Sequence, residues 1–216
     1  NRLYTGENCC LSIAGAIPRN IENLIGKSLI SELRKSSSED LSKRGTQIPL
    51  FKKVREEISI PRLESARFIM AWPIAPAKEQ LIVMGADIAT SLLAEGRRSR
   101  LVQRLREELQ IVESIDMDIT VLEESSLILL EACCKEDELQ HVEHEVHKVL
   151  KESLNSTPEE QELNRASHLV RNGLCFNLEA ASQVAGIAGS QALWNRTHPL
   201  LEPLEHINYW SSSKLQ

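Results

Sequence analysis

Three histidines, His141, His144 and His147, lie within the stretch HVEHEVH, and imidazole is a common ligand of zinc. The surrounding residues have the spacing of a helix, with an apolar face formed by Leu139, Val142, Val146, Val149 and Leu150. The histidines lie outside that face and are spread over about 120° at helical periodicity. A zinc ion needs three or four ligands that converge. The segment therefore predicts a solvated helix face, and we expect no metal ligands in this chain.

The five cysteines form two adjacent pairs and a singleton: Cys9 and Cys10, Cys133 and Cys134, and Cys175. No C-x-x-C spacing occurs, and adjacent residues of a strand point to opposite faces, so neither pair makes one ligand set. The cysteines are interpreted as small side chains in buried strands of a reduced protein. This interpretation favours a reduced soluble compartment, the cytoplasm.

The tripeptide Gly26-Lys27-Ser28 is similar to the end of a phosphate-binding loop. Ile21 stands where that loop requires its first glycine, and the tripeptide lies within a helical pattern, so no nucleotide site is predicted. Catalysis by a Ser–His–Asp or Cys–His arrangement stays open, because no local signature supports or excludes it.

Five arginines are concentrated near the start of an expected helix: Arg97, Arg98, Arg100, Arg104 and Arg106. Arginines at such a place can hold an acidic peptide group or a carboxylate of another domain. No aromatic residues accompany them, and the chain has 25 basic and 31 acidic residues, a net charge of −6. Nucleic acid is therefore not an expected partner.

The elements that must position these residues come as pairs of strands separated by helices. Hydrophobic residues make up 42% and charged residues 26% of the 216 residues, as in soluble globular domains. Strands are predicted at residues 8–14, 53–60, 65–74, 111–121 and 126–134. Helices are predicted at residues 18–33, 78–94, 99–109, 137–153, 157 to about 180, on to 193, and 202–210. The expected fold class is α+β, a two-layer, mostly antiparallel sheet with helices packed on one face.

No stretch reaches the roughly 18 uncharged apolar residues of a membrane span, so no membrane partner is expected. The chain opens at Asn1 without a signal-like region. We expect residues 1–216 to form a single domain excised from a longer, two-domain chain.

The residues from Gly96 to Glu107 follow the pattern G-x-x-S-R-L-x-x-x-L-R-E. This segment resembles a signature of the pitrilysin/insulinase family of zinc metallopeptidases, which includes the mitochondrial processing peptidases. The order of strands and helices before and after it is also similar, so the resemblance covers nearly the whole chain. It implies a peptidase-like domain with the processing-peptidase-like metallohydrolase fold.

In that family one half carries zinc on an inverted H-x-x-E-H motif, and a homologous second half lacks the motif and closes over the substrate. None of the six histidines here lies in H-x-x-E-H or H-E-x-x-H. The resemblance therefore implies the second half, with no cofactor in this fragment and zinc in the partner half. The partners implied are that zinc-bearing half and a peptide substrate. The parent is expected to be a zinc metalloendopeptidase, and this fragment alone is expected to be inactive.

In active relatives the second half often supplies an Arg and a Tyr spaced as R-x-x-x-x-x-x-Y. By this resemblance Arg106 is the candidate catalytic residue, and Glu113 occupies the tyrosine position. An ionised carboxylate repels a developing oxyanion, so either another residue serves or this half only shapes the chamber. The alternative for Arg106 is a surface ion pair with a nearby glutamate.

The first functional hypothesis is the non-catalytic half of a zinc metallopeptidase, which closes the substrate chamber and docks on the zinc-bearing half for peptide hydrolysis. The alternative is a catalytically dead peptidase-like scaffold or structural subunit, similar to the core subunits of the respiratory bc1 complex, which Glu113 slightly favours. A third reading is an α+β interaction module unrelated to peptidases. An H-x-x-E-H motif upstream of Asn1 would distinguish the peptidase from the scaffold.

Overall fold

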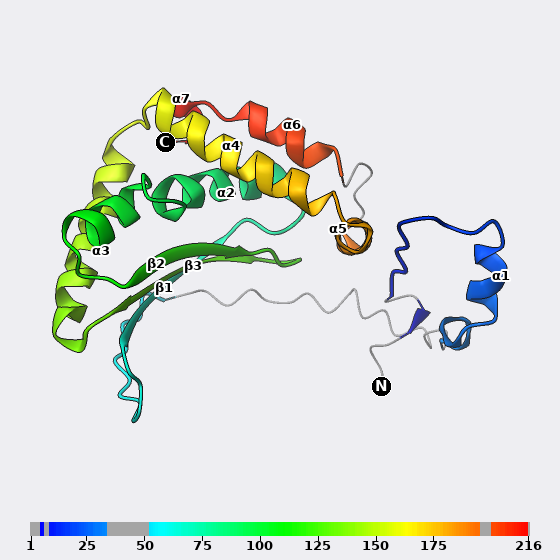
Figure 1. Cartoon of the computed structure of the whole chain (residues 1–216), viewed down its shortest axis with the longest axis horizontal. Helices are drawn as coiled ribbons and strands as arrows, with labels where there is room; N and C mark the ends of the chain where they lie inside the picture. The colour runs from blue at the N-terminus through cyan, green and yellow to red at the C-terminus, as the bar shows by residue number, and fades with distance from the viewer. Residues whose placement is uncertain (1–4, 7–8, 34–51, 195–199, 216) are drawn as a thin grey trace. The chain divides into compact units, whose positions relative to one another are not determined.

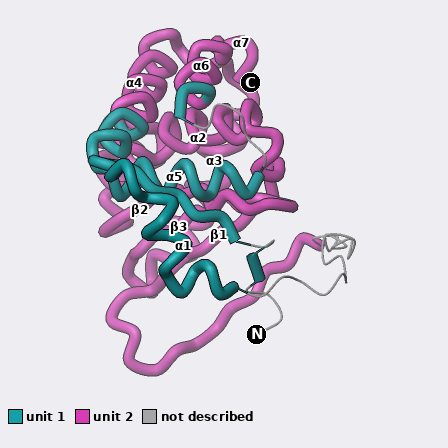
Figure 2. Tube along the Cα trace, turned by 90° about the vertical axis from the view of Figure 1, so that its right-hand side faces the viewer, with its two compact units in different colours: residues 1–47, 173–202 teal, residues 48–172, 203–216 magenta. Residues whose placement is uncertain are grey.

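The computed structural model describes residues 5–6, 9–33, 52–194 and 200–215. Its contacts divide the chain into two compact units, residues 1–47 with 173–202 and residues 48–172 with 203–216 (Figure 2). The expectation of one domain excised from a longer chain stays a prediction. Residues 34–51, which include the segment between the helix predicted over 18–33 and the strand predicted over 53–60, lie outside the described residues.

Three strands form the sheet of the larger unit: β1 Ala66–Ile74, β2 Ser114–Thr120 and β3 Ser126–Cys134. Both pairings are antiparallel and the order is β1-β3-β2, so β3 is central. Burial alternates along each strand, because successive side chains of a pleated strand point to opposite faces. The strands predicted at 65–74, 111–121 and 126–134 are confirmed, with β2 beginning three residues later than expected.

Helices cover one face of this sheet, and Figure 1 shows α2, α3 and the first part of α4 on the same side of it. The helical elements are α2 Gln80–Ala94, η4 Val102–Glu108, η5 Glu136–Glu138, α3 Leu139–Asn155, α4 Glu160–Asn177, α6 Glu202–Tyr209 and α7 Ser212–Leu215. The core between the layers is aliphatic, with Leu101, Leu105, Leu130, Val142 and Val146 fully buried. The predicted two-layer α+β fold is confirmed. None of the described helices has both the length and the apolar character to cross a bilayer.

The smaller unit contains α1 Ile21–Gly26, the single-turn helix η2 Leu29–Glu32, α5 Ala181–Leu193 and the end of α4. The prediction of one continuous helix over 18–33 is wrong, because the helical conformation is interrupted at Ser28. The backbone of Ser28 is extended (φ −89°, ψ 165°), and its hydroxyl donates to the carbonyl of Ile25 at 2.7 Å. A serine that bonds its own local backbone competes with helix propagation.

Two predicted strands are also wrong in the part of the chain that the structure describes, since residues 9–14 and 53–60 form no ladder. In the second of them Val54 and Ile58 are 68% and 74% exposed. An alternating pattern becomes a strand only where a neighbouring strand pairs its backbone and a core buries its apolar side. Residues 53–60 are instead tethered by Arg55, whose Nε donates to Glu143 of α3 at 2.9 Å.

Candidate functional site

The turn between α2 and η4 positions the signature arginines. Gly96 has φ +80°, a left-handed conformation, and it follows the end of α2 at Ala94, the last residue of the helix predicted over 78–94. Ser99 is fully buried, and its hydroxyl donates to the carbonyl of Gly96 at 2.7 Å. The carbonyl of Ser99 accepts the N–H of Gln103 at 2.8 Å. Ser99 therefore joins the turn to the start of the next helix, in the region where a helix was predicted.

The helix η4 is wound more widely than an α-helix. The N–H of Leu109 donates to the carbonyl of Arg104, five residues earlier, at 3.1 Å, and Gln110 then adopts φ +55°. Such π-type turns are frequent at functional sites. Leu105 is fully buried and anchors one side of η4, whereas the next residue, Arg106, is 49% exposed.

The guanidinium of Arg106 has one weak neighbour among the described residues. Its Nε lies 3.7 Å from Oε1 of Glu107, beyond hydrogen-bond length. The other carboxylate oxygen of Glu107 accepts a hydrogen bond from Nη2 of Arg97 at 2.6 Å, which lowers the pKa of Glu107. Because Glu107 is engaged mainly by Arg97, Arg106 keeps most of its donors for another group.

Glu113, at the predicted tyrosine position, is fastened to the end of the sheet. Its carboxylate accepts a hydrogen bond from the hydroxyl of Ser65 at 3.3 Å and one from the thiol of Cys133 at 3.7 Å. Its backbone N–H donates to the carbonyl of Cys133 at 2.8 Å. Glu113 therefore acts as an acceptor and forms no ion pair with Arg106 in the described structure. It offers no donor to an oxyanion.

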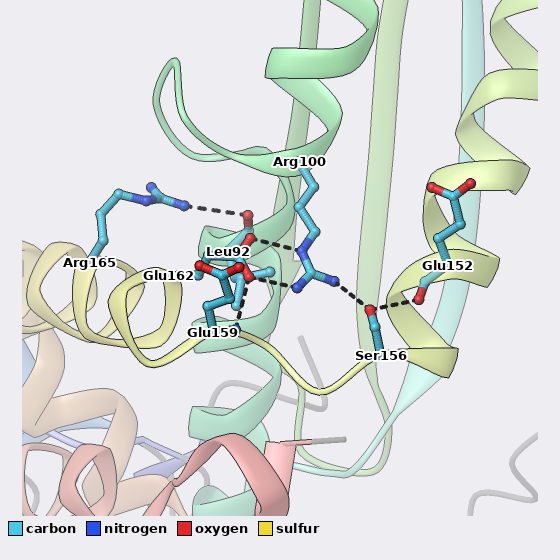
Figure 3. Close-up of polar contacts among 7 residues, drawn as sticks. All are labelled: Leu92, Arg100, Glu152, Ser156, Glu159, Glu162 and Arg165. Carbon is cyan, nitrogen blue, oxygen red and sulfur yellow. Dashed lines mark hydrogen bonds and ion pairs between the residues drawn. The ribbon is translucent and has the colours of Figure 1, made fainter.

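Besides Arg97, which pairs with Glu107 nearby in sequence, two of the five clustered arginines are bound by carboxylates of distant helices. Arg100 donates from Nε and Nη2 to the two oxygens of Glu162 at 3.0 and 2.7 Å, and from Nη1 to the hydroxyl of Ser156 at 3.5 Å (Figure 3). Arg104 donates from Nε to the buried carboxylate of Glu145 at 2.8 Å. Arg100, just before η4, thus holds α4, and Arg104, within η4, holds α3, so neither of these two is free to receive an acidic group from outside the chain. Their partners lie 62 and 41 residues away in sequence, and no local pattern indicates them.

The contacts of the Glu162 carboxylate also stabilise the first turn of α4. A third hydrogen bond reaches Glu162, from the backbone N–H of Glu159 at 3.1 Å. Arg165, one turn further, donates from Nη1 to the carbonyl of Glu95 at 2.8 Å and from Nη2 to the carbonyl of Leu92 at 3.4 Å, and so satisfies the end of α2. Figure 3 shows the contact with Leu92. The helix α4 therefore begins at Glu160, three residues after the start predicted at residue 157, and Glu162 supplies its capping carboxylate.

The histidine stretch lies on α3. Nδ1 of His141 is 3.1 Å from the carboxylate of Glu138, a contact within the start of the helix. Among the residues that the structure describes, no three His, Cys, Asp or Glu side chains gather as metal ligands would.

Comparisons with known proteins agree with this architecture. Residues 1–170 match the family described as peptidase M16 inactive domain. A protease from Helicobacter pylori has a similar structure, with TM-score 0.72 and 18% identity over 94% of this chain and 49% of that chain. A peptidase M16 inactive domain from Pseudomonas fluorescens has TM-score 0.70 and 14% identity over 92% of this chain and 47% of that chain. The periplasmic protease PqqL from Escherichia coli has TM-score 0.65 and 15% identity over 93% of this chain and 22% of that chain.

At these identities the solved structures show a shared fold. The chain spans about half the length of the first two structures and about a fifth of the third. A search of the curated proteins finds no match. The resemblance carried by the segment from Gly96 to Glu107 is confirmed by the family match, which includes that segment.

Proposed function

Because the chain belongs to the peptidase M16 inactive domain family, we propose that it is the non-zinc half of a zinc peptidase and closes the substrate chamber over the zinc-bearing half. The observation that carries this proposal is that the chain covers only about half of a similar protease. The match uses 94% of this chain but 49% of the H. pylori protease, which leaves room in that protease for a second domain of similar size. A homologous partner half, in the same polypeptide or in a partner subunit, fills that place.

Zinc belongs to the partner half in this proposal. The residues of this chain do not fit it, since the sequence contains neither H-x-x-E-H nor H-E-x-x-H, and the described residues hold no ligand cluster. When bound in the partner half, zinc supplies a water nucleophile with a lowered pKa.

The part of this chain in the reaction is to enclose the peptide and to present Arg106. The guanidinium is half exposed on a helix whose other side is anchored by the buried Leu105. A preorganised cation of this kind stabilises the negative charge that develops on a peptide carbonyl oxygen. Glu113 accepts hydrogen bonds from Ser65 and Cys133, so the charge stabilisation expected from this half comes from Arg106 alone.

A second candidate is a catalytically dead scaffold, and Glu113 is the observation that favours it. A carboxylate in place of a phenol removes one donor and adds a negative charge where an oxyanion would form. In that case the parent would keep the two-half architecture and lack zinc and hydrolysis.

The test compares the chain alone, the zinc-bearing half alone and the two together. We expect the chain alone to hold no stoichiometric zinc by elemental analysis and to leave a quenched fluorescent peptide uncut. Mixed with the zinc-bearing half, it should restore cleavage that the other half lacks by itself. One equivalent of tightly held zinc in this chain, or cleavage that is independent of it, would refute the proposal. A stable pair without zinc or cleavage would support the scaffold.

A further inference from the structure

The two pairs of adjacent cysteines lie in different surroundings. Cys133 and Cys134 end the strand β3, where successive side chains point to opposite faces of the sheet. Cys134 is fully buried, whereas the thiol of Cys133 donates to the carboxylate of Glu113 at 3.7 Å. Because the strand directs these two thiols apart, they cannot bind one ion together, as the sequence predicts.

The other pair, Cys9 and Cys10, is exposed, and residues 9–14 form no strand. The interpretation of these two cysteines as small side chains in a buried strand is therefore wrong. The geometric reason for separating their thiols does not apply to them either. Adjacent Cα atoms are about 3.8 Å apart across a trans peptide bond, and without a pleated strand both sulfur atoms can turn to one side of the backbone.

Contacts with α5 hold the residues that follow this pair. A Cβ built on Gly189 of α5 would lie 3.2 Å from Cβ of Ser12, so the lack of a side chain at residue 189 lets Ser12 approach the helix. A Cβ on Gly15 would lie 3.7 Å from Cβ of Ala181, at the start of the same helix. The backbone is therefore held against α5 two residues after Cys10, while the two thiols stay exposed to solvent.

The number of ligands limits which ion the pair can hold. Within the described part of the chain, no three His, Cys, Asp or Glu side chains gather as metal ligands would. An ion at Cys9 and Cys10 thus has two thiolates as its protein ligands. Structural zinc sites take four ligands. Monovalent copper, Cu(I), is a soft ion that thiolates select, and it accepts two of them.

We propose that Cys9 and Cys10 form a binding site for one Cu(I) ion. Each thiol loses its proton on binding, and each sulfur donates an electron pair to the ion. Two protons are released, the copper stays monovalent, and no oxidant or reductant is consumed. This site goes beyond the proposed function, because zinc and hydrolysis belong to the partner half and neither involves this pair.

The binding test titrates the reduced full chain with Cu(I), without oxygen, in competition with the chromogenic chelator bathocuproine disulfonate. We expect the chain to withdraw one copper ion from the chelator. Cys9→Ser and Cys10→Ser should each weaken binding about 100-fold or more, because the second thiolate of a pair acts as an intramolecular ligand. Copper retained by the double variant Cys9→Ser, Cys10→Ser as tightly as by the unchanged chain would overturn the site.

Two other single variants are the matched controls. Cys175→Ser removes an exposed thiol of α4 that has no adjacent cysteine, and Cys133→Ser removes one thiol of the pair that the strand separates. Neither should change the copper affinity. A loss in Cys175→Ser as large as that in Cys9→Ser would show adventitious binding by single thiols and overturn the paired site.

X-ray absorption at the copper edge of the unchanged chain gives a readout that depends on no variant. Two sulfur ligands support the pair, and a copper ion with three or four protein ligands would overturn it. The same chain is then incubated with zinc and examined by elemental analysis. One equivalent of retained zinc would refute the proposed function, whereas failure to bind copper would refute this site alone.

Discussion

The indole ring of Trp210 lies against the backbone of Gly85, in the middle of α2. A Cβ built on Gly85 would be 2.3 Å from Cζ2 of Trp210, and the indole Nε1 donates to the carbonyl of Leu81 at 3.1 Å. The glycine thus allows the residue after α6 to fasten the end of the chain to α2.

Replacing Gly85 by alanine should therefore lower the free energy of unfolding by about 1–3 kcal/mol, because the indole must move or lose its hydrogen bond. The measurement is denaturant unfolding followed by tryptophan fluorescence. Gly173→Ala is the control, since a Cβ there meets nothing within 4 Å and should raise helix stability by up to about 1 kcal/mol. Equal effects in the two variants would contradict the contact.

Gln110 provides a second test of local geometry, because its φ of +55° is strained for a residue with a side chain. Gln110→Gly should raise the free energy of unfolding by about 0.5–1 kcal/mol through relief of that strain. Gln103→Gly, within η4, should lower it by about 1 kcal/mol, since glycine is a poor helix former. Thermal unfolding of the two variants distinguishes the signs, and destabilisation by both would show that Gln110 is unstrained.

The sequence predicts the elements whose stabilising groups are local. The strands β1 and β3 follow from short, mostly apolar runs, and the end of α2 follows from Gly96, which has a left-handed conformation. Residues 53–60 have a weak alternation of apolar and polar residues but no partner strand, and the hydroxyl of Ser28 bonds its local backbone where a helix is interrupted. A pattern of residue types cannot show whether a partner is present.

In the candidate site, too, the sequence predicts the contiguous motif but not the contacts between distant residues. The segment from Gly96 to Glu107 identified the family, because its motif is contiguous. The partners of Arg100 and Arg104 lie on α4 and α3, and the sequence contains several glutamates equally suited to each. Which arginines remain available to a substrate is therefore visible only in the fold, where Arg106 keeps its donors.

Asp87 should make stability depend on pH. Its pKa is raised from 3.8 to about 6 by burial first and by Glu95 second, and Asp87 lines one hollow with Asp116 and Asp118. A carboxyl whose folded pKa is raised destabilises the fold when it ionises, so stability falls as pH rises from about 4 to about 6. Asp87→Asn should therefore raise the free energy of unfolding above that of the unchanged chain, and this increase should be about 2–3 kcal/mol larger at pH 8 than at pH 4. The measurement is denaturant unfolding of both proteins at pH 4 and pH 8. An equal increase in the free energy of unfolding at the two pH values would contradict the raised pKa of Asp87.

The ion pair between Arg100 and Glu162 should behave in the opposite way. Hydrogen bonds from Arg100 lower the pKa of Glu162, so the pair stabilises the fold above the ordinary pKa of glutamate and loses that effect as pH falls through the lowered value. Glu162→Gln should cost about 1–2 kcal/mol at pH 7 and less at pH 3. Glu160→Gln removes an exposed carboxylate from the same turn and should cost a few tenths of a kcal/mol. Equal losses from the two variants at pH 7 would show that the bidentate contact contributes nothing.

Arg106→Ala tests the catalytic part of the proposed function in the assembled, zinc-bearing protein. If the guanidinium stabilises the oxyanion, kcat should fall by roughly 10- to 1000-fold while zinc content and assembly stay unchanged. The control is Arg98→Ala, because Arg98 is exposed and forms no ion pair with a described residue. Glu113→Tyr in the same protein should raise kcat, since a phenol adds a donor where the carboxylate now accepts from Ser65 and Cys133. An unchanged kcat in Arg106→Ala would remove the charge-stabilising role and leave this half with enclosure of the peptide alone.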